Sequence, residues 1–203
     1  MSISINHHRE GAGEPLVLLH GVGHHWQAWQ PVIPLLAPSC DVLACDLPGF
    51  GRSAPLPRGM EPTIPSYADA FEWFFAELGL GRPHVAGNSM GGAIALELAR
   101  RRAVRSATAF SPAGFWTSAE RRFCQLSLGL LGSTPRPARP VVERMARARS
   151  GRRLLFRQTF GYPERLDADE AVATLRDAWA APSLAGALAA FGSYRFKPLE
   201  RLG

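Results

Sequence analysis

Ser89 lies between two glycines in the stretch HVAGNSMGGAIALEL, which covers residues 84–98. An apolar run precedes the serine, a helical run follows it, and Gly87 and Gly91 stand two residues to either side. A serine at a sharp turn from a strand into a helix has a strained backbone, and a side chain at either glycine position would collide with neighbouring elements. The pattern is typical of a serine nucleophile, the group that attacks a carbonyl carbon.

Two backbone amides are candidates for stabilising the negative charge that such an attack creates. Met90 follows the serine at the start of the expected helix, where its N–H gains from the helix dipole. The stretch LLHGVGHHW ends another apolar run with His20 and Gly21. If this run is a strand, we expect the backbone after Gly21 to cross the top of the sheet to which the strand belongs. This turn can aim the Val22 N–H at the same oxyanion.

A serine nucleophile requires a general base, and the six histidines all precede Ser89 in the sequence: His7, His8, His20, His24, His25 and His84. Carboxylates do follow it, on expected helices or in the terminal segment: Asp167, Asp169, Glu170, Asp177 and Glu200. Two interpretations therefore stay open. The base and acid lie beyond residue 203, or the protein keeps a pocket without the chemistry.

Strands and helices must position these residues, and the sequence alternates apolar runs with helical patterns. This alternation predicts an α/β fold with a mainly parallel sheet and flanking helices. Strands are expected at 15–21, 41–51, 84–89 and 104–112, and the N-terminal SISINHHREG is expected to pair at a sheet edge. Helices are expected over 26–37, after Ser66 and Asp69 at capping spacing, and from Met90 onward.

The second half changes character after Phe115. Thr117 with Glu120, and Asp167 with Glu170, have the spacing of helix N-terminal capping boxes, and the stretch 133–140 is rich in proline. No strand alternation is visible between 117 and 196. The expected division is a core over 1–116, a helical cap over 117–196, and the start of a return to the core over 197–203.

Three motifs in this order and at these distances resemble the α/β-hydrolase fold superfamily, in its branch with a serine nucleophile: the HG turn at 20–21, DLPGFGRS at 46–53 and GNSMGG at 87–92. The resemblance is strong over residues 1 to about 115, and 117–196 is similar in position and helicity to the family's cap. It implies Ser89 as the nucleophile, the Val22 and Met90 amides as the oxyanion hole, and a supporting turn made by His20, Gly21, Gly87, Asn88 and Gly91.

The same resemblance implies a chain order of serine, acid and histidine, with the histidine near the C-terminus. The early acid position, just after the strand expected at 104–112, reads SPAGFW and has no carboxylate. The sequence therefore predicts that the last core strands are absent, that the chain is C-terminally truncated, and that 104–112 is left as an edge strand. His20 and Asp46 are expected to hold their loops, and His24 and His25 to be exposed loop histidines.

The expected activity is that of a serine-dependent hydrolase of a small ester, thioester or related carbonyl compound, acting through an acyl-enzyme on Ser89. The alternatives are a non-catalytic pseudo-hydrolase or ligand-binding remnant, a C–C bond hydrolase, a cofactor-free haloperoxidase, or a chain completed by a separate partner chain. The dehalogenase and epoxide hydrolase branches use aspartate at this position, so Ser89 argues against them.

Composition excludes several other classes. With 203 residues, 46% of them hydrophobic, the chain can bury one sizeable core. It has neither a signal peptide nor a membrane-length apolar run, so we expect a cytoplasmic protein with no membrane partner. The three cysteines, Cys40, Cys45 and Cys124, lack the spacing of a disulfide framework or zinc site, and we expect buried thiols and no metal or cofactor.

The net charge of +6 is carried by arginine and is concentrated between residues 100 and 165, where fifteen arginines face three glutamates. A patch for nucleic acid, an anionic membrane or an acidic ligand is one interpretation. A solvated helical surface is favoured, because no aromatic residues alternate with the basic ones and no nucleic-acid motif is present. The expected partner is a small-molecule substrate, with no nucleic acid.

Overall fold

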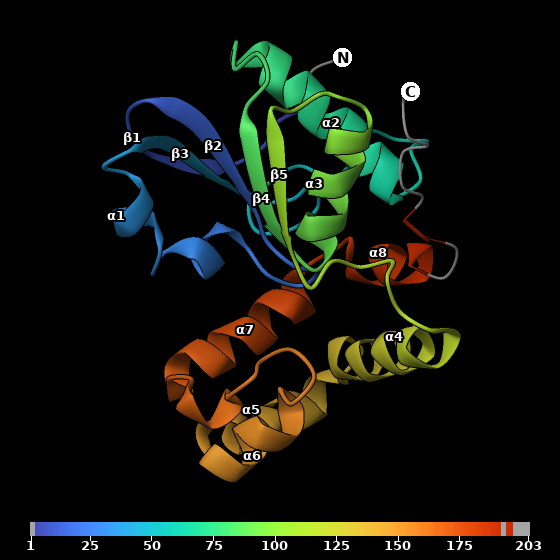
Figure 1. Cartoon of the computed structure of the whole chain (residues 1–203). Coiled ribbons are helices and arrows are strands. Elements are labelled where there is room, and N and C mark those ends of the chain that lie inside the picture. Colours follow the sequence, from blue (N-terminus) through green and yellow to red (C-terminus); the bar gives the residue numbers. More distant parts are fainter. Residues whose placement is uncertain (1–2, 192–193, 197–203) are drawn as a thin grey trace.

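The central element of the computed structural model, which describes residues 3–191 and 194–196, is a five-stranded sheet (Figure 1). Its strands are β1 (His7–Gly11), β2 (Glu14–Leu19), β3 (Cys40–Cys45), β4 (His84–Asn88) and β5 (Ser106–Phe110), arranged in the order β1-β3-β2-β4-β5. The last four are parallel, and β1 pairs antiparallel with β3 at one edge. The predicted fold class is confirmed.

The strands that carry the motifs lie in the interior of the sheet. Val17, Leu18 and Leu19 of β2 are fully buried, because parallel strands are covered on both faces. In contrast, β5 is an edge strand of the described sheet, and the side chain of its last residue, Phe110, is 50% exposed. The motif residues at the ends of β2 and β4 therefore rest on the most rigid part of the fold.

Helices cover the two faces of the sheet unequally. Helices α2 (Ile64–Glu77) and α3 (Met90–Arg100) pack on one face and share the main hydrophobic core with it. The short elements η1 (Trp26–Trp29) and α1 (Ile33–Leu36) pack on the other face, where a smaller cluster forms around Leu18.

Two expected helices differ in the structure. The helix predicted after Ser66 begins three residues earlier, because the Thr63 hydroxyl caps it by accepting a bond from the Ser66 N–H at 3.3 Å, and Pro65 fits the first turn. The helix predicted over 26–37 is broken into η1 and α1. Pro31 falls between the two elements and has no N–H to donate, whereas Pro34 fits the first turn of α1.

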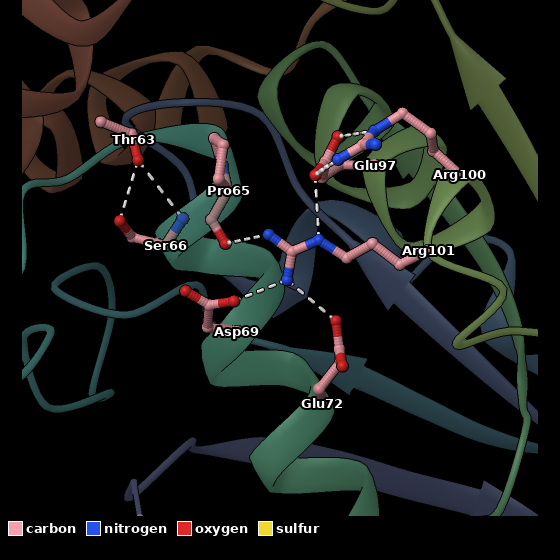
Figure 2. A network of polar contacts seen from close by, with 8 residues as sticks. All are labelled: Thr63, Pro65, Ser66, Asp69, Glu72, Glu97, Arg100 and Arg101. Atoms are coloured by element: carbon pink, nitrogen blue, oxygen red, sulfur yellow. Dashed lines mark hydrogen bonds and ion pairs between the residues drawn. The ribbon is translucent and has the colours of Figure 1, made fainter. Parts of the chain in front are cut away.

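Arg101, just beyond the end of α3, joins α3 to α2 (Figure 2). Its guanidinium donates to the carboxylates of Glu97, Asp69 and Glu72 at 2.6–2.9 Å and to the Pro65 carbonyl at 3.0 Å. Burial alone raises the pKa of Glu97, but its bonds from Arg100 and Arg101 outweigh this and leave the pKa lowered. The network fixes the helix that begins directly after Ser89.

Residues 117–191 form what we call the helical segment. It contains α4 (Ser118–Gly132), η2 (Arg136–Ala138), α5 (Arg139–Arg147), α6 (Arg149–Leu155), η3 (Pro163–Arg165), α7 (Ala168–Ala180) and α8 (Leu184–Ala190). Thr117 and Glu120 form the expected capping box, and the Asp167 carboxylate caps α7. In Figure 1, α4 to α7 gather beyond the end of the sheet where β5 runs into α4.

The helical segment has a small core of its own around Phe156 and Leu175, while α8 belongs to the main core through Leu184 and Leu188. In the part of the chain that the structure describes, none of the helices combines the length and the apolar character needed to cross a bilayer. The expected return to the core over 197–203 lies outside the described residues.

Candidate active site

Ser89 occupies the turn between β4 and α3 with φ 52° and ψ −110°, a backbone conformation that residues other than glycine rarely adopt. Its N–H donates to the Phe110 carbonyl at 2.9 Å, and its own carbonyl accepts from the N–H groups of Ala93 and Ala113, each at 3.0 Å. These three bonds hold the strained residue in place. The serine side chain remains partly exposed at the carboxyl end of the strand.

The two flanking glycines let the turn pack tightly. A Cβ on Gly87 would lie 2.2 Å from the Gly91 carbonyl oxygen, and a Cβ on Gly91 would lie 2.2 Å from the carbonyl oxygen of Leu19 at the end of β2. The Gly91 N–H donates to the His20 carbonyl at 3.1 Å. The start of α3 therefore rests directly on the end of the neighbouring strand.

The turn that follows β2 lies against Ser89. We call residues 20–26 the HG loop. A Cβ on Gly21 would stand 3.4 Å from the Ser89 Cβ and 3.1 Å from the Asn88 Oδ1, so the loop passes beside the serine. Val22 follows in this loop, and Met90 is the first residue of α3, where N–H groups have no partner within the helix.

His20 is buried and bonded through both ring nitrogens. Nε2 accepts from the Leu47 N–H at 2.9 Å, so Nδ1 carries the hydrogen and donates to the Gly21 carbonyl at 2.7 Å. Burial lowers the pKa of His20 to about 3. A neutral imidazole with both nitrogens engaged holds two loops together and has no lone pair left to accept a proton from Ser89.

The buried His20 gives the fold a testable acid sensitivity. The unfolded chain binds a proton at this histidine below its ordinary pKa of 6.5 and the folded chain does not, so His20 lowers stability as the pH falls. We expect it to contribute a slope of about 1.4 kcal/mol per pH unit between about pH 5.5 and 4. Urea unfolding of the unaltered protein and His20→Asn over this range measures the slope, and equal slopes in the two proteins would contradict the assignment.

The Asp46 side chain is buried at the end of β3 and organises the surrounding loops. Its Oδ2 accepts from the Asn6 side-chain amide at 2.7 Å and the Arg52 N–H at 2.9 Å, and its Oδ1 accepts from the Trp26 N–H at 2.7 Å. Trp26 ends the HG loop. Asp46 thus anchors the end of that loop.

His24 and His25 were expected to be exposed, and the structure places them half-buried against the helical segment. The His24 ring lies 6.3 Å from that of Phe160, and burial lowers the pKa of His24 to about 4. His25 Nε2 lies 2.5 Å from Oδ2 of Asp177 on α7. The expectation was wrong because the covering helices are more than a hundred residues away in the sequence.

The structure brings together, at one end of the sheet, the predicted turn at residues 87–91, which we call the elbow, the HG loop and the DLPGFGRS loop. Among the described contacts, none joins a histidine ring to the Ser89 hydroxyl. No group of three or more metal-binding side chains occurs in the described ranges. Of the cysteines, Cys45 is buried as expected, whereas Cys40 and Cys124 are only partly buried.

Part of the arginine excess is neutralised on the surface of the helical segment. Arg147 pairs with Asp169 at 2.6 Å, Arg176 with Glu143 at 2.6 Å and Arg153 with Glu164 at 3.6 Å. The acids come from other elements of the same segment, which the sequence alone does not place beside these arginines.

Comparison with known proteins finds a match to the family model described as the alpha/beta hydrolase fold over residues 14–195. A pimeloyl-[acyl-carrier protein] methyl ester esterase of Aeromonas hydrophila is 39% identical over 99 residues, which are 49% of this chain and 36% of that protein. A 2-hydroxy-6-oxo-2,4-heptadienoate hydrolase of Pseudomonas putida is 37% identical over 102 residues, 49% of this chain and 37% of that protein.

Among solved structures, a thermophilic esterase from Thermogutta terrifontis has a similar fold. Its TM-score is 0.61 at 23% identity, with 91% of this chain and 67% of that one covered. The matched stretches span little more than a third of the two curated relatives.

Proposed function

Because the chain belongs to the α/β-hydrolase fold family, we propose that it is a serine-dependent hydrolase of a small ester, thioester or related carbonyl compound, with Ser89 as the nucleophile. The observation that carries the proposal is the strained conformation of Ser89, with φ 52° at the junction of β4 and α3. Strain of this kind persists where the surrounding structure enforces it and is concentrated at functional sites.

In the proposed reaction the Ser89 Oγ bonds to the carbonyl carbon of the substrate and passes its proton to a general base. The negative charge moves to the carbonyl oxygen, where the N–H groups of Val22 and Met90 donate hydrogen bonds to it. The intermediate collapses with release of the alcohol or thiol, which takes up the proton, and leaves an acyl group on Ser89. Water then attacks the acyl-enzyme, releases the acid and restores the serine.

The helical segment is proposed to serve as a cap that selects the substrate. Leu128 of α4, Ala178 of α7 and Leu184 of α8 pack with the hydrophobic cluster that also holds Met90 and Val22. A Cβ on Gly23, the residue after Val22, would lie 3.4 Å from the Ala178 Cβ and 3.7 Å from the Leu184 Cδ1, so apolar side chains of the helical segment lie beside this part of the HG loop. This favours an apolar acyl or aryl group over a charged one.

A non-catalytic binding protein with the same Ser89 turn and HG loop is the second candidate. The absence of a described contact between any histidine and the Ser89 hydroxyl favours it, while the retained strain at Ser89 opposes it. A C–C bond hydrolase is a variant of the first candidate, supported by the likeness to the heptadienoate hydrolase. The same nucleophile and the same oxyanion hole would serve both reactions.

Labelling by a fluorophosphonate, a probe that reacts with activated serines, separates the candidates. We expect one adduct, on the peptide that contains Ser89, and we expect Ser89→Ala to reduce labelling to background. Ser111→Ala is the matched control, because Ser111 also has a positive φ, of 45°, and directly follows β5. It should leave labelling unchanged, and labelling of the unaltered chain no higher than that of Ser89→Ala would favour the binding protein.

A further inference from the structure

A side-chain bond joins the HG loop to the helical segment across 152 positions of sequence. Its partners are His25, at the end of the loop, and Asp177, on α7, with 2.5 Å between Nε2 and Oδ2. Within the described parts of the chain, no other side-chain hydrogen bond connects these two elements. Both side chains are half-buried, so water screens the pair less than it screens a surface ion pair.

The bond lies where the loop and the helix are already in close packing. A Cβ on Gly23 would lie 3.4 Å from the Cβ of Ala178, the residue next to Asp177. Val22, whose amide the proposed function requires, directly precedes Gly23. Movement of α7 away from the loop would therefore release the backbone on the C-terminal side of Val22.

A second contact ties the same end of α7 to the core. The Ser183 N–H, between α7 and α8, donates to the Gly49 carbonyl at 3.4 Å, and a Cβ on Gly49 would overlap the Ser183 side chain. This contact holds the connection between α7 and α8 but does not touch the HG loop. The loop itself is held at its base by His20 and, through the Trp26 N–H, by Asp46.

We propose that His25 and Asp177 form a latch that holds the HG loop and α7 together, so that His25 is a positioning residue for the Val22 amide and for the cap over Ser89. The inference rests on the proposed function of the Ser89 site. His25 acts through the loop, since its Nε2 is engaged by Asp177 and no described contact joins it to Ser89.

The charges around His25 make the latch dependent on pH. The bond from Asp177 raises the pKa of His25, with burial acting in the opposite direction. Besides Asp177 on α7, the groups that face it are Asp46 at the end of β3, His20 and His24 in the HG loop, and Gln27 of η1. A cavity of about 580 Å³ beside the pair is also lined by His7, His8 and Arg52.

The sign of the dependence follows from the direction of the shift. A histidine whose pKa is raised in the folded state gives its full stabilisation below the ordinary value of 6.5 and loses it as the pH rises through the raised value. The latch should therefore be tight in mild acid and loose in alkali. The buried Nδ1 of His25, which has no partner among the described atoms, limits how strongly the protonated form is favoured.

Hydrogen exchange on the full chain tests the latch without requiring turnover. At about pH 6, His25→Asn and Asp177→Asn should each lower the protection factors of residues 21–26 and of α7 by about tenfold, the size of a lost charge-assisted hydrogen bond. The double variant should lower them no further. In the unaltered protein the protection should fall as the pH rises from 6.5 into the alkaline range, and in both variants it should not.

The matched control is His84→Asn. His84 pairs with Glu14 at 2.8 Å between β4 and β2, far from α7 in the sequence. The His84→Asn substitution should leave the protection factors of residues 21–26 unchanged. Unchanged protection in His25→Asn and Asp177→Asn, or a loss no larger than that in His84→Asn, would overturn the latch.

Fluorophosphonate labelling of the same variants links the latch to the site. Both latch variants should be labelled at Ser89 about tenfold more slowly, with the pH dependence of the labelling rate changed as well, whereas the control should not differ. If the unaltered chain takes no label, the proposed function fails while the exchange result still decides the latch. Normal labelling in variants with lowered protection would show that His25 does not position the Ser89 site.

Discussion

Gly91→Ala is expected to destabilise the fold by about 3 kcal/mol or more, which raises the ratio of unfolded to folded protein by more than about a hundredfold. The added Cβ would lie 2.2 Å from the Leu19 carbonyl oxygen and 2.6 Å from that of His20. Both atoms belong to the backbone of the central strand or of the turn that follows it, and neither can move without breaking the packing of the elbow. Urea unfolding followed by circular dichroism measures the loss.

Gly129→Ala is the matched control for this substitution. Gly129 also lies in a helix, α4, and a Cβ there would meet nothing within 4 Å. We expect it to raise stability by about 0.5–1 kcal/mol, since alanine favours a helix interior. A Gly91→Ala protein as stable as Gly129→Ala would mean that the elbow does not pack on β2 as described.

The elbow could be predicted from sequence because its signals are local. The apolar strand before Ser89, the two glycines and the helical run after it all lie within fifteen residues, and each has one structural explanation. The capping box of Thr117 and Glu120 was predictable for the same reason. The helical pattern over 26–37 was less reliable because two prolines lie within it, and it did not predict the break between η1 and α1.

The contacts that depend on tertiary packing could not be predicted. The sequence presents His25 as a loop residue and Asp177 as a residue on an amphipathic helix, and only the folding of the helical segment over the HG loop makes them neighbours. The start of α2 is a milder case. Ser66 and Asp69 have the spacing of a cap, but Ser66 donates its N–H to the Thr63 hydroxyl, and Asp69 accepts from Arg101, just beyond the end of α3.

The HG loop, the DLPGFGRS loop and the N-terminal segment converge on one buried carboxylate, so Asp46→Ala should produce the second large effect. Its oxygens accept from the N–H groups of Trp26 and Arg52 and from the side chain of Asn6, all at 2.7–2.9 Å. Removal of the carboxylate takes the acceptor from three N–H donors whose hydrogen bonds are partly buried. Each such donor costs about 1–3 kcal/mol, and relaxation of the loops recovers part of it, so we expect a net loss of about 3–4 kcal/mol.

Asp46→Asn sharpens the test because it keeps the shape of the side chain. Both carboxylate oxygens accept from N–H groups, so whichever way the amide is oriented its NH2 faces a donor, and we expect a loss of about 2 kcal/mol. Asp69→Asn, at a carboxylate that is 42% exposed, should cost less than about 1 kcal/mol. Because Trp26 ends the HG loop, Asp46→Asn should also lower hydrogen-exchange protection in residues 21–26. If Asp46→Asn and Asp69→Asn lowered the protection of these residues equally, Asp46 would not be the anchor of this loop.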